Sequence, residues 1–205
     1  MSDLYQSNRK LVATYRQQLQ QKIVSLHQAE QSSDNIDPQK FYLGFKDRAI
    51  ELVQKETDLL QKECADSDNC HLLLLKQTAL VDTLVQASFY SAVWYFNHQN
   101  NQEWTTQSVP IAIVARGGYG REEMYFRSDV DIQIVSESSI SESDKKTAEQ
   151  IIRHFEYLFV FQDIFPASIN ACYTENETFE KDQDTAKVAA FMALLEHRFV
   201  AGNSL

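Results

Sequence analysis

The sequence has few cysteines, no long apolar run free of polar residues and an N-terminus without a signal pattern. Its three cysteines, Cys64, Cys70 and Cys172, are an odd number without metal-ligand spacing, so neither a disulfide framework nor a cysteine-based metal site is expected. No stretch of about 18 residues is both uncharged and apolar throughout, and no charged segment followed by an apolar one opens the chain, so neither a membrane span nor secretion is expected. These absences predict a cytoplasmic protein with reduced thiols.

Positive charge is also scarce. The chain has 19 Lys and Arg residues against 29 Asp and Glu residues, which gives a formal net charge of −10. No basic stripe interrupts this acidity, so a nucleic acid is not expected as the main partner. A small anionic nucleotide held together with a metal ion is compatible with such a chain. The length of 205 residues allows one domain or two small ones.

Glycine is rare, yet three of the five glycines, Gly117, Gly118 and Gly120, lie close together. They follow residues 110–115, an apolar run rich in β-branched residues that predicts a buried strand. Because glycine has no Cβ, it tolerates positive φ and lets a ligand approach the backbone, so glycines packed this closely after a strand fit a phosphate-binding turn. We expect Gly118 to need such backbone room or a positive φ. The alternative is a simple Gly-Gly hairpin.

A second strand is predicted at residues 129–135, Asp-Val-Asp-Ile-Gln-Ile-Val. Strand alternation places its aliphatic residues at even positions on one face and Asp129, Asp131 and Gln133 on the other. Same-face residues lie roughly 6 to 7 Å apart, so the two carboxylates can converge on one Mg²⁺ or bridge a pair of ions. A solvated strand face is the alternative. Aspartate is depleted in strands, however, and two aspartates just after a Gly-Gly turn favour a metal site.

Helical spacing of apolar residues predicts three helices in the first half of the chain, at 4–30, 38–63 and 71–96. Asp37, followed by proline, is typical of an N-cap with proline at the first helical position. The third helix is the most apolar, although charged residues such as Asp82 interrupt it. It is therefore expected to be the central helix of an N-terminal bundle.

Three more elements are predicted after the two strands. A capping-box-like pattern begins a helix at 141–159. Residues 164–174 form a predicted strand, whose proline indicates an edge or a bulge. Asp184 is expected to cap a last helix, with Phe199 on its apolar face and Gly202 as its C-terminal stop.

The sequence GGYGREEMYFRSDVDIQIV, which begins at Gly117, resembles the signature of the polymerase-β-like nucleotidyltransferase superfamily. That signature is a Gly-Gly or Gly-Ser turn followed by Asp-x-Asp on the next strand. The run is most similar to the N-terminal catalytic region of bacterial PII uridylyltransferase/uridylyl-removing enzymes, which carry Gly-Gly-Tyr-Gly-Arg and Ser-Asp-x-Asp. The resemblance covers residues 80–202, and residues 115–131 carry its specific part.

For the architecture, the resemblance implies an α+β protein. A helical N-terminal region at residues 1–100 is expected to precede a nucleotidyltransferase-like domain at residues 108–205. This second domain has a mixed sheet with helices on one side. The polar loop at 97–108 is the expected boundary.

For the site, the resemblance implies a nucleoside triphosphate whose phosphates contact Gly117 and Gly118. It implies Mg²⁺ on Asp129 and Asp131, which would be the catalytic residues. The reaction would transfer a nucleoside monophosphate to an acceptor hydroxyl, with pyrophosphate leaving. By the same resemblance, the acceptor is a PII-like signalling protein.

Two further polar residues are nucleotide-binding candidates. Arg121, like Arg116, flanks the glycines and could neutralise triphosphate charge, or it could form an ion pair with Glu122 or Glu123. Ser128 precedes the first aspartate and could contact a phosphate or cap the turn.

The sequence departs from the family pattern at a third carboxylate. Aligning Asp163 and Thr174 with the family's flanking Asp and Thr puts Ala167 where a glutamate would fall. A missing acid would weaken metal binding and activation of the attacking hydroxyl. This opens a second hypothesis, a catalytically weakened nucleotide-binding module whose helical region docks a partner. A purely structural helical adaptor would leave the Gly-Gly and Asp-x-Asp pairing unexplained.

The larger enzymes of this family carry a phosphohydrolase domain and regulatory ligand-binding domains after the catalytic region. Neither is found in these 205 residues. The chain is therefore expected to be a fragment or a stand-alone relative.

Overall fold

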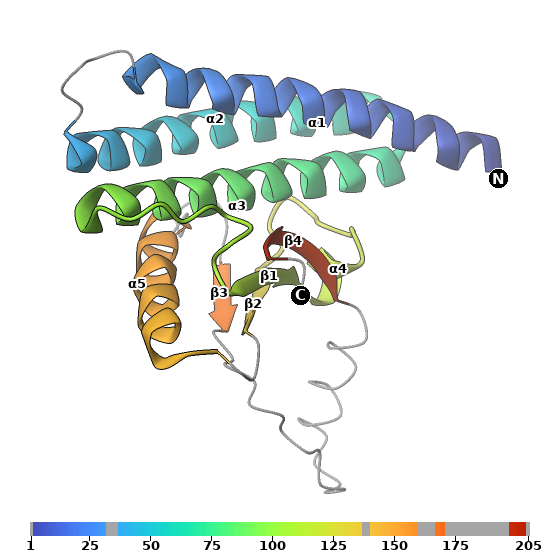
Figure 1. The fold of residues 1–205 in the computed structure, drawn as a ribbon. Coiled ribbons are helices and arrows are strands. Elements are labelled where there is room, and N and C mark those ends of the chain that lie inside the picture. Colours follow the sequence, from blue (N-terminus) through green and yellow to red (C-terminus); the bar gives the residue numbers. More distant parts are fainter. Residues whose placement is uncertain (1, 32–36, 137–139, 160–166, 171–196, 204–205) are drawn as a thin grey trace, which may run out of the picture.

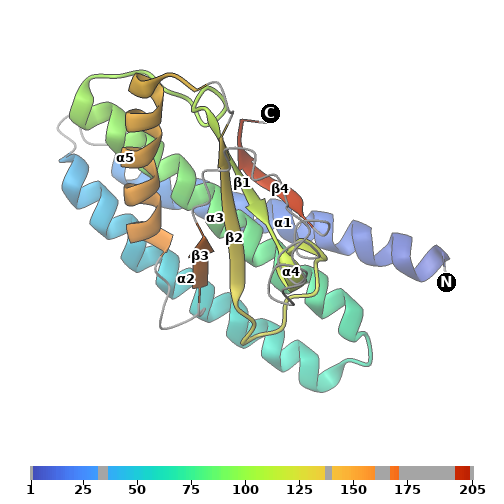
Figure 2. The same ribbon diagram turned by 90° about the horizontal axis from the view of Figure 1, so that it is seen from below.

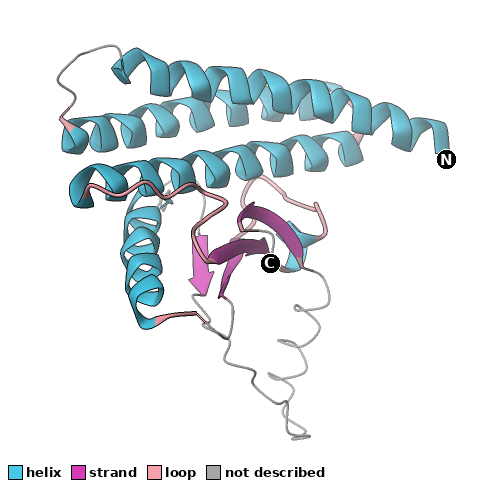
Figure 3. Cartoon of the chain, in the orientation of Figure 1, coloured by secondary structure: helices cyan, strands magenta, loops and turns pink. Residues whose placement is uncertain are grey.

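The computed structural model describes residues 2–31, 37–136, 140–159, 167–170 and 197–203. Three long helices lie side by side above a small sheet, and a further helix runs down beside that sheet (Figures 1 and 3). The long helices are α1 (Ser2–Gln31), α2 (Pro38–Asp66) and α3 (Cys70–Asn100), at the positions that the apolar periodicity predicts. No helix in the described ranges is both long and apolar enough to cross a membrane.

The burial of the long helices follows from their places in the fold. α3 lies between the other two helices and the sheet (Figure 1), so side chains around its whole circumference are buried. An apolar sequence all round is what such a position requires. α1 buries only a stripe that includes Val12, Leu19 and Ile23, and this confirms the predicted amphipathic helix.

Asp37 caps α2 as predicted. Its carboxylate accepts hydrogen bonds from the Gln39 N–H at 3.0 Å and the Lys40 N–H at 3.4 Å, and Pro38 is the first helical residue. The first N–H groups of a helix have no partner within the helix, so Asp37→Ala is expected to lower the free energy of unfolding by about 1 kcal/mol. Urea unfolding followed by circular dichroism measures this change. An unchanged midpoint would show that water replaces the cap without loss.

The sheet has four strands in the order β3-β2-β1-β4. They are β1 (Ile111–Ala115), β2 (Val130–Ser136), β3 (Ala167–Asn170) and β4 (Arg198–Gly202). β1 pairs antiparallel with β2 and β4, whereas β3 runs parallel to β2, so the sheet is mixed, as predicted. Figure 2 shows α3 passing behind the sheet and α5 (Glu142–Phe159) lying beside it. The chain is thus an α+β protein.

One continuous hydrophobic core joins the helices to the sheet. It includes Phe45 of α2, Leu84 of α3, Ile113 of β1, Ile132 of β2 and Phe155 of α5. Each of these side chains is 1% exposed or less. The helices and the sheet are therefore packed together, and the division into two domains stays a prediction.

The predicted C-terminal helix is wrong at its end. Residues 198–202 form β4, which pairs with β1 and leaves Phe199 half exposed. Gly202 has a φ of 99°, and a Cβ there would lie 2.3 Å from the Ile111 carbonyl oxygen. This glycine therefore allows close approach to β1 and does not end a helix. Residues 184–196 of the predicted helix lie outside the described residues.

The two other elements predicted after β2 agree with the structure where it describes them. The Ser141 hydroxyl accepts a hydrogen bond from the Asp144 N–H at 3.1 Å, which confirms the predicted start of α5. The strand predicted at 164–174 is confirmed at Ala167–Asn170. Its other residues lie outside the described part of the chain.

Candidate functional site

The glycine-rich turn joins the end of β1 to a single helical turn, α4 (Gly117–Gly120), so it is not a two-residue hairpin. Arg116 is extended, and its N–H donates to the Asp131 carbonyl oxygen at 3.0 Å. Gly117 has a φ of 55°, in the left-handed region that favours glycine, whereas Gly118 is not in that region. The expected positive φ at Gly118 is therefore wrong, and this requirement belongs to Gly117.

The turn brings Gly117 against the carboxylate of Asp131. Antiparallel pairing of β1 with β2 places the start of the turn beside the start of β2. A Cβ at Gly117 would lie 3.1 Å from Asp131 Oδ2. At Gly118 the nearest atom to a Cβ would be the Glu123 carbonyl oxygen at 3.8 Å, an ordinary contact. The missing side chain at Gly117 therefore lets the turn lie close to the Asp131 carboxylate.

The two predicted metal ligands differ in their exposure. Asp129 precedes β2 and is exposed, whereas Asp131 lies within β2 and is half-buried. Val130 is buried on the opposite face, as predicted. Gln133, however, is only 4% exposed, so the face that strand alternation gives it in common with Asp131 is not open at this position. This face closes after Asp131 because the middle of β2 is covered.

The carboxylate pair fits a hard cation. Mg²⁺ is usually held by one or two carboxylates together with waters and substrate phosphates, and Asp129 and Asp131 supply such a pair close to the glycine turn. Within the described ranges, no three His, Cys, Asp or Glu residues gather in a way that could hold a metal ion. The described residues therefore offer two carboxylates here and no third side chain for a metal ion.

The other nucleotide-binding candidates have partners within the turn. Arg121 Nε donates to Glu123 Oε2 at 2.8 Å on the surface, which is the ion pair foreseen as the alternative. The Ser128 hydroxyl accepts a hydrogen bond from the Tyr125 N–H at 3.0 Å, so Ser128 caps a turn just before Asp129. Both residues thus shape the connection that leads into β2.

The register of β3 shows which of its residues pair with the start of β2. Ala167 is opposite Val130, and Ser168 is opposite Asp131. Because paired residues on neighbouring strands lie on the same face of a sheet, the position beside Asp131 belongs to Ser168. Ala167 thus lies one residue before the position paired with Asp131, and its match to the family's glutamate stays a prediction.

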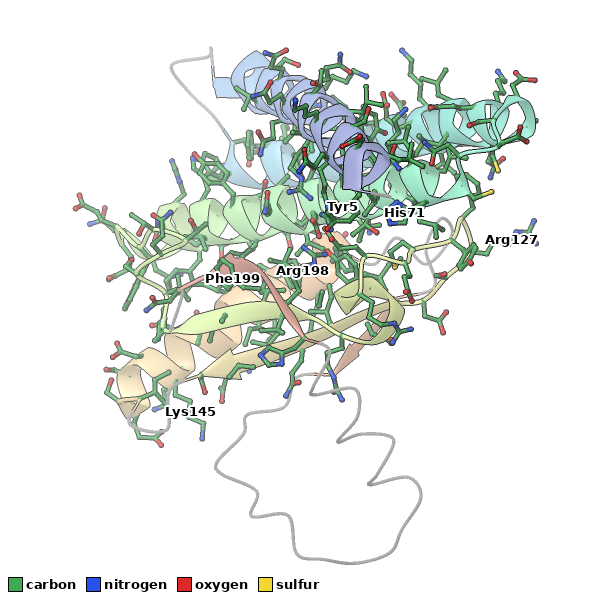
Figure 4. All side chains as sticks on the ribbon, turned by 90° about the vertical axis from the view of Figure 1, so that its right-hand side faces the viewer. Tyr5, His71, Arg127, Lys145, Arg198 and Phe199 are labelled. Carbon is green, nitrogen blue, oxygen red and sulfur yellow. The ribbon has the colours of Figure 1, made fainter. Side chains whose placement is uncertain are left out.

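A buried ionic cluster centred on Asp82 of α3 contacts the glycine turn. Asp82 of α3 has a side chain that is only 3% exposed, and it accepts hydrogen bonds from Arg16 of α1, Tyr119 of the turn and Arg198 of β4. Figure 4 shows Arg198 between β4 and α3. The sequence interpretation missed this cluster and treated Asp82 as an interruption of an apolar helix. A carboxylate in so apolar a helix requires buried cationic partners, and this was the available signal.

Two acid–base groups near the turn are held in defined protonation states. Burial raises the pKa of the Tyr119 phenol well above its ordinary value, and the adjacent Asp82 carboxylate raises it further. The phenol therefore stays protonated and donates. Burial acts to raise the pKa of Glu122, but the hydrogen bonds and charge of Arg9 outweigh it, so this pKa is lowered and Glu122 stays ionised.

No protein-family model matches the chain. Three curated relatives carry the name bifunctional uridylyltransferase/uridylyl-removing enzyme. The protein from Zymomonas mobilis is 34% identical over 111 residues, which are 51% of this chain and 11% of the relative. The protein from Cereibacter sphaeroides is 31% identical over 132 residues, with 64% and 13% covered. The protein from Neisseria meningitidis serogroup A is 27% identical over 156 residues, with 76% and 16% covered.

These comparisons show a distant relationship to uridylyltransferases. The chain spans between 11% and 16% of the length of the three relatives. It is therefore similar to one small part of each of these enzymes.

Proposed function

We propose that the chain is a nucleotidyltransferase domain that transfers a nucleoside monophosphate from a triphosphate to an acceptor hydroxyl, with Mg²⁺ as cofactor. One observation carries the proposal: Gly117, in a left-handed conformation, lets the turn lie close to the Asp131 carboxylate. A turn that admits phosphates and a carboxylate that binds metal are thereby adjacent. The named relatives support a nucleotidyltransferase-like activity.

The residues of the site have separate roles in this proposal. The backbone at Gly117 approaches the phosphates, because no Cβ stands between them and the chain, and Gly118 follows it in the same turn. Asp129 and Asp131 hold the metal, and Asp131 is the more fixed of the two because it lies within β2. When bound, Mg²⁺ would neutralise triphosphate charge and align it for in-line attack. Arg121 lies on the same turn and offers a guanidinium to phosphate oxygens once it leaves Glu123.

UTP is the nucleotide that we propose, and a PII-like signalling protein is the acceptor. The first follows from the name of the relatives, which describes transfer and removal of uridylyl groups. The second follows from the sequence resemblance of the turn and of Asp-x-Asp. The acidity of the chain, with a formal net charge of −10, fits a small nucleotide with metal better than a nucleic acid.

Calorimetric titration with ATP, UTP, GTP and CTP, each with and without Mg²⁺, tests the proposal. We expect Mg²⁺-dependent binding with UTP preferred. Asp131→Asn is expected to weaken this binding by about tenfold or more, because it removes a charged metal ligand. Its melting temperature should stay within a few degrees of wild type, since the half-buried carboxamide has the same shape. Asp58→Asn, the same change at an exposed position on α2, is the matched control and should bind as wild type.

Two results would contradict this assignment. Equal binding by Asp131→Asn and wild type would show that the carboxylate holds no metal. A large loss of stability in Asp131→Asn would show that Asp131 is structural.

A nucleotide-binding module without transfer activity is the second candidate function. It is favoured by the absence of a third metal-binding side chain near Asp129 and Asp131 within the described residues. The helices would then offer a docking surface for a partner. Mg²⁺-dependent binding of UTP without release of pyrophosphate in the presence of a PII-like protein would identify this module.

A further inference from the structure

We infer that Asp82 is a positioning residue, which holds the glycine turn in place through Tyr119 and Arg198. Its role in nucleotide binding rests on the proposed function. Its role in fixing the turn can be measured without a nucleotide.

Tyr119 is the residue through which Asp82 acts. It lies between Gly118 and Gly120, and its side chain is 1% exposed. Its hydroxyl donates to Asp82 Oδ1 at 2.8 Å. Glycines give this part of the chain little conformational restraint of their own, so a buried hydrogen bond from the only non-glycine residue in α4 fixes the whole turn.

Arg198 completes the restraint. Its Nη2 donates to Asp82 Oδ1 at 2.8 Å and its Nη1 to Asp82 Oδ2 at 3.0 Å, so the guanidinium and the carboxylate form a two-bond pair. The same Nη2 also lies 3.4 Å from the Tyr119 carbonyl oxygen. The side chain and the main chain of Tyr119 are therefore both held by one buried ion pair that links α3 to β4.

Two arginines of α1 add to this restraint, one through Asp82 and one through the residue that follows the turn. Arg16 Nη2 donates to Asp82 Oδ2 at 2.9 Å. Arg9 forms a two-bond ion pair with Glu122, whose φ is 63°. Because left-handed conformations are unfavourable for residues other than glycine, this ion pair helps to hold the chain where it leaves α4. The N-terminal helix thus contributes to the geometry of the glycine turn.

The restraint matters for the site because the tolerance there is small. Gly117 is two residues from Tyr119. A Cβ added to Gly117 would lie only 3.1 Å from Asp131 Oδ2. A shift of α4 by less than a bond length would narrow or widen the gap between Gly117 and this carboxylate. Asp82 therefore acts on the nucleotide site without contacting it.

A second tyrosine that donates to a buried carboxylate provides the control. Tyr15 of α1 donates to Glu56 Oε2 of α2 at 3.2 Å, Glu56 is also paired with Lys22, and its side chain is 3% exposed. Tyr119→Phe and Tyr15→Phe each remove one phenolic hydroxyl from a buried carboxylate that keeps a cationic partner. Both variants should therefore fold, and only the first should disturb the turn.

The experiment measures amide hydrogen exchange at residues 117–121 and the Kd for UTP with Mg²⁺ in wild type and in both variants. In Tyr119→Phe we expect faster exchange at these amides and a Kd raised about tenfold, the effect of one hydrogen bond to a charged group. In Tyr15→Phe we expect unchanged exchange at the turn and a Kd within about twofold of wild type. Asp82→Asn should exceed Tyr119→Phe in both measurements, and Glu56→Gln should resemble Tyr15→Phe.

The outcomes separate this inference from the proposed function. Unchanged exchange at residues 117–121 in Tyr119→Phe and Asp82→Asn would overturn the positioning role, whatever the nucleotide does. Equal effects of the two tyrosine substitutions on the Kd would also overturn it. Wild type that binds no nucleotide would reject the proposed function, and the exchange comparison would still decide whether Asp82 fixes the turn.

Discussion

Replacing Gly117 with alanine is expected to weaken UTP binding by about tenfold or more and to lower the free energy of unfolding by about 1 to 2 kcal/mol. The stability loss has a backbone cause, since a residue with a Cβ is unfavourable at a φ of 55°. The binding loss has a local cause. The new Cβ would lie 3.1 Å from Asp131 Oδ2, and it would occupy the space that phosphate and metal need.

Gly118→Ala is the matched control, because it makes the same chemical change one residue later. Its Cβ would meet only ordinary contacts, with the Glu123 carbonyl oxygen at 3.8 Å and Arg121 Nη2 at 4.0 Å. Its backbone is not left-handed, so its stability should equal or exceed that of wild type. Urea unfolding and calorimetric titration of both variants make the comparison. If Gly118→Ala lost as much binding as Gly117→Ala, the space beside Asp131 would not be the reason.

Ser168→Glu is expected to lower, by about tenfold, the Mg²⁺ concentration that half-saturates the chain in the presence of UTP. Ser168 is opposite Asp131 in the parallel pairing of β2 with β3. A third acid at this place adds negative charge beside Asp131, and affinity for a divalent ion rises with the number of charged ligands. Pyrophosphate release in the presence of an acceptor should rise with it.

Ala167→Glu tests the same strand register at the preceding position of β3. Ala167 is opposite Val130, which is fully buried. A glutamate there would be at the register position of Val130 and not of Asp131, so we expect no gain in Mg²⁺ affinity. Tighter Mg²⁺ binding by Ala167→Glu than by Ser168→Glu would show that the alignment without the structural register was correct.

The helices and the two central strands could be predicted from the sequence because their signals are local. Apolar spacing along α1, the Asp37 cap and the alternation of β2 all lie within one element, and each agrees with the structure. The adjacency of the glycine turn and Asp131 could also be predicted, because only a short connection separates them.

The features that the sequence did not predict depend on contacts between distant parts of the chain. β4 forms because residues 198–202 pair with β1, and helical spacing around Phe199 could not reveal that pairing. Asp82 owes its role to Arg16, Tyr119 and Arg198, three residues from three other elements. The choice between Gly117 and Gly118 for the positive φ likewise required the backbone itself, since both are glycines in the same turn.

The most direct test of a nucleotide site shared by the glycine turn and Asp131 is paramagnetic broadening by Mn²⁺, used in place of Mg²⁺. Mn²⁺ with UTP would be added in substoichiometric amounts to the ¹⁵N-labelled chain, and amide signals would be recorded. We predict selective broadening at residues 117–120 and 129–132, and much weaker broadening in Asp131→Asn at the same concentrations. Broadening centred on another part of the chain, or equal broadening in Asp131→Asn, would contradict the proposed site.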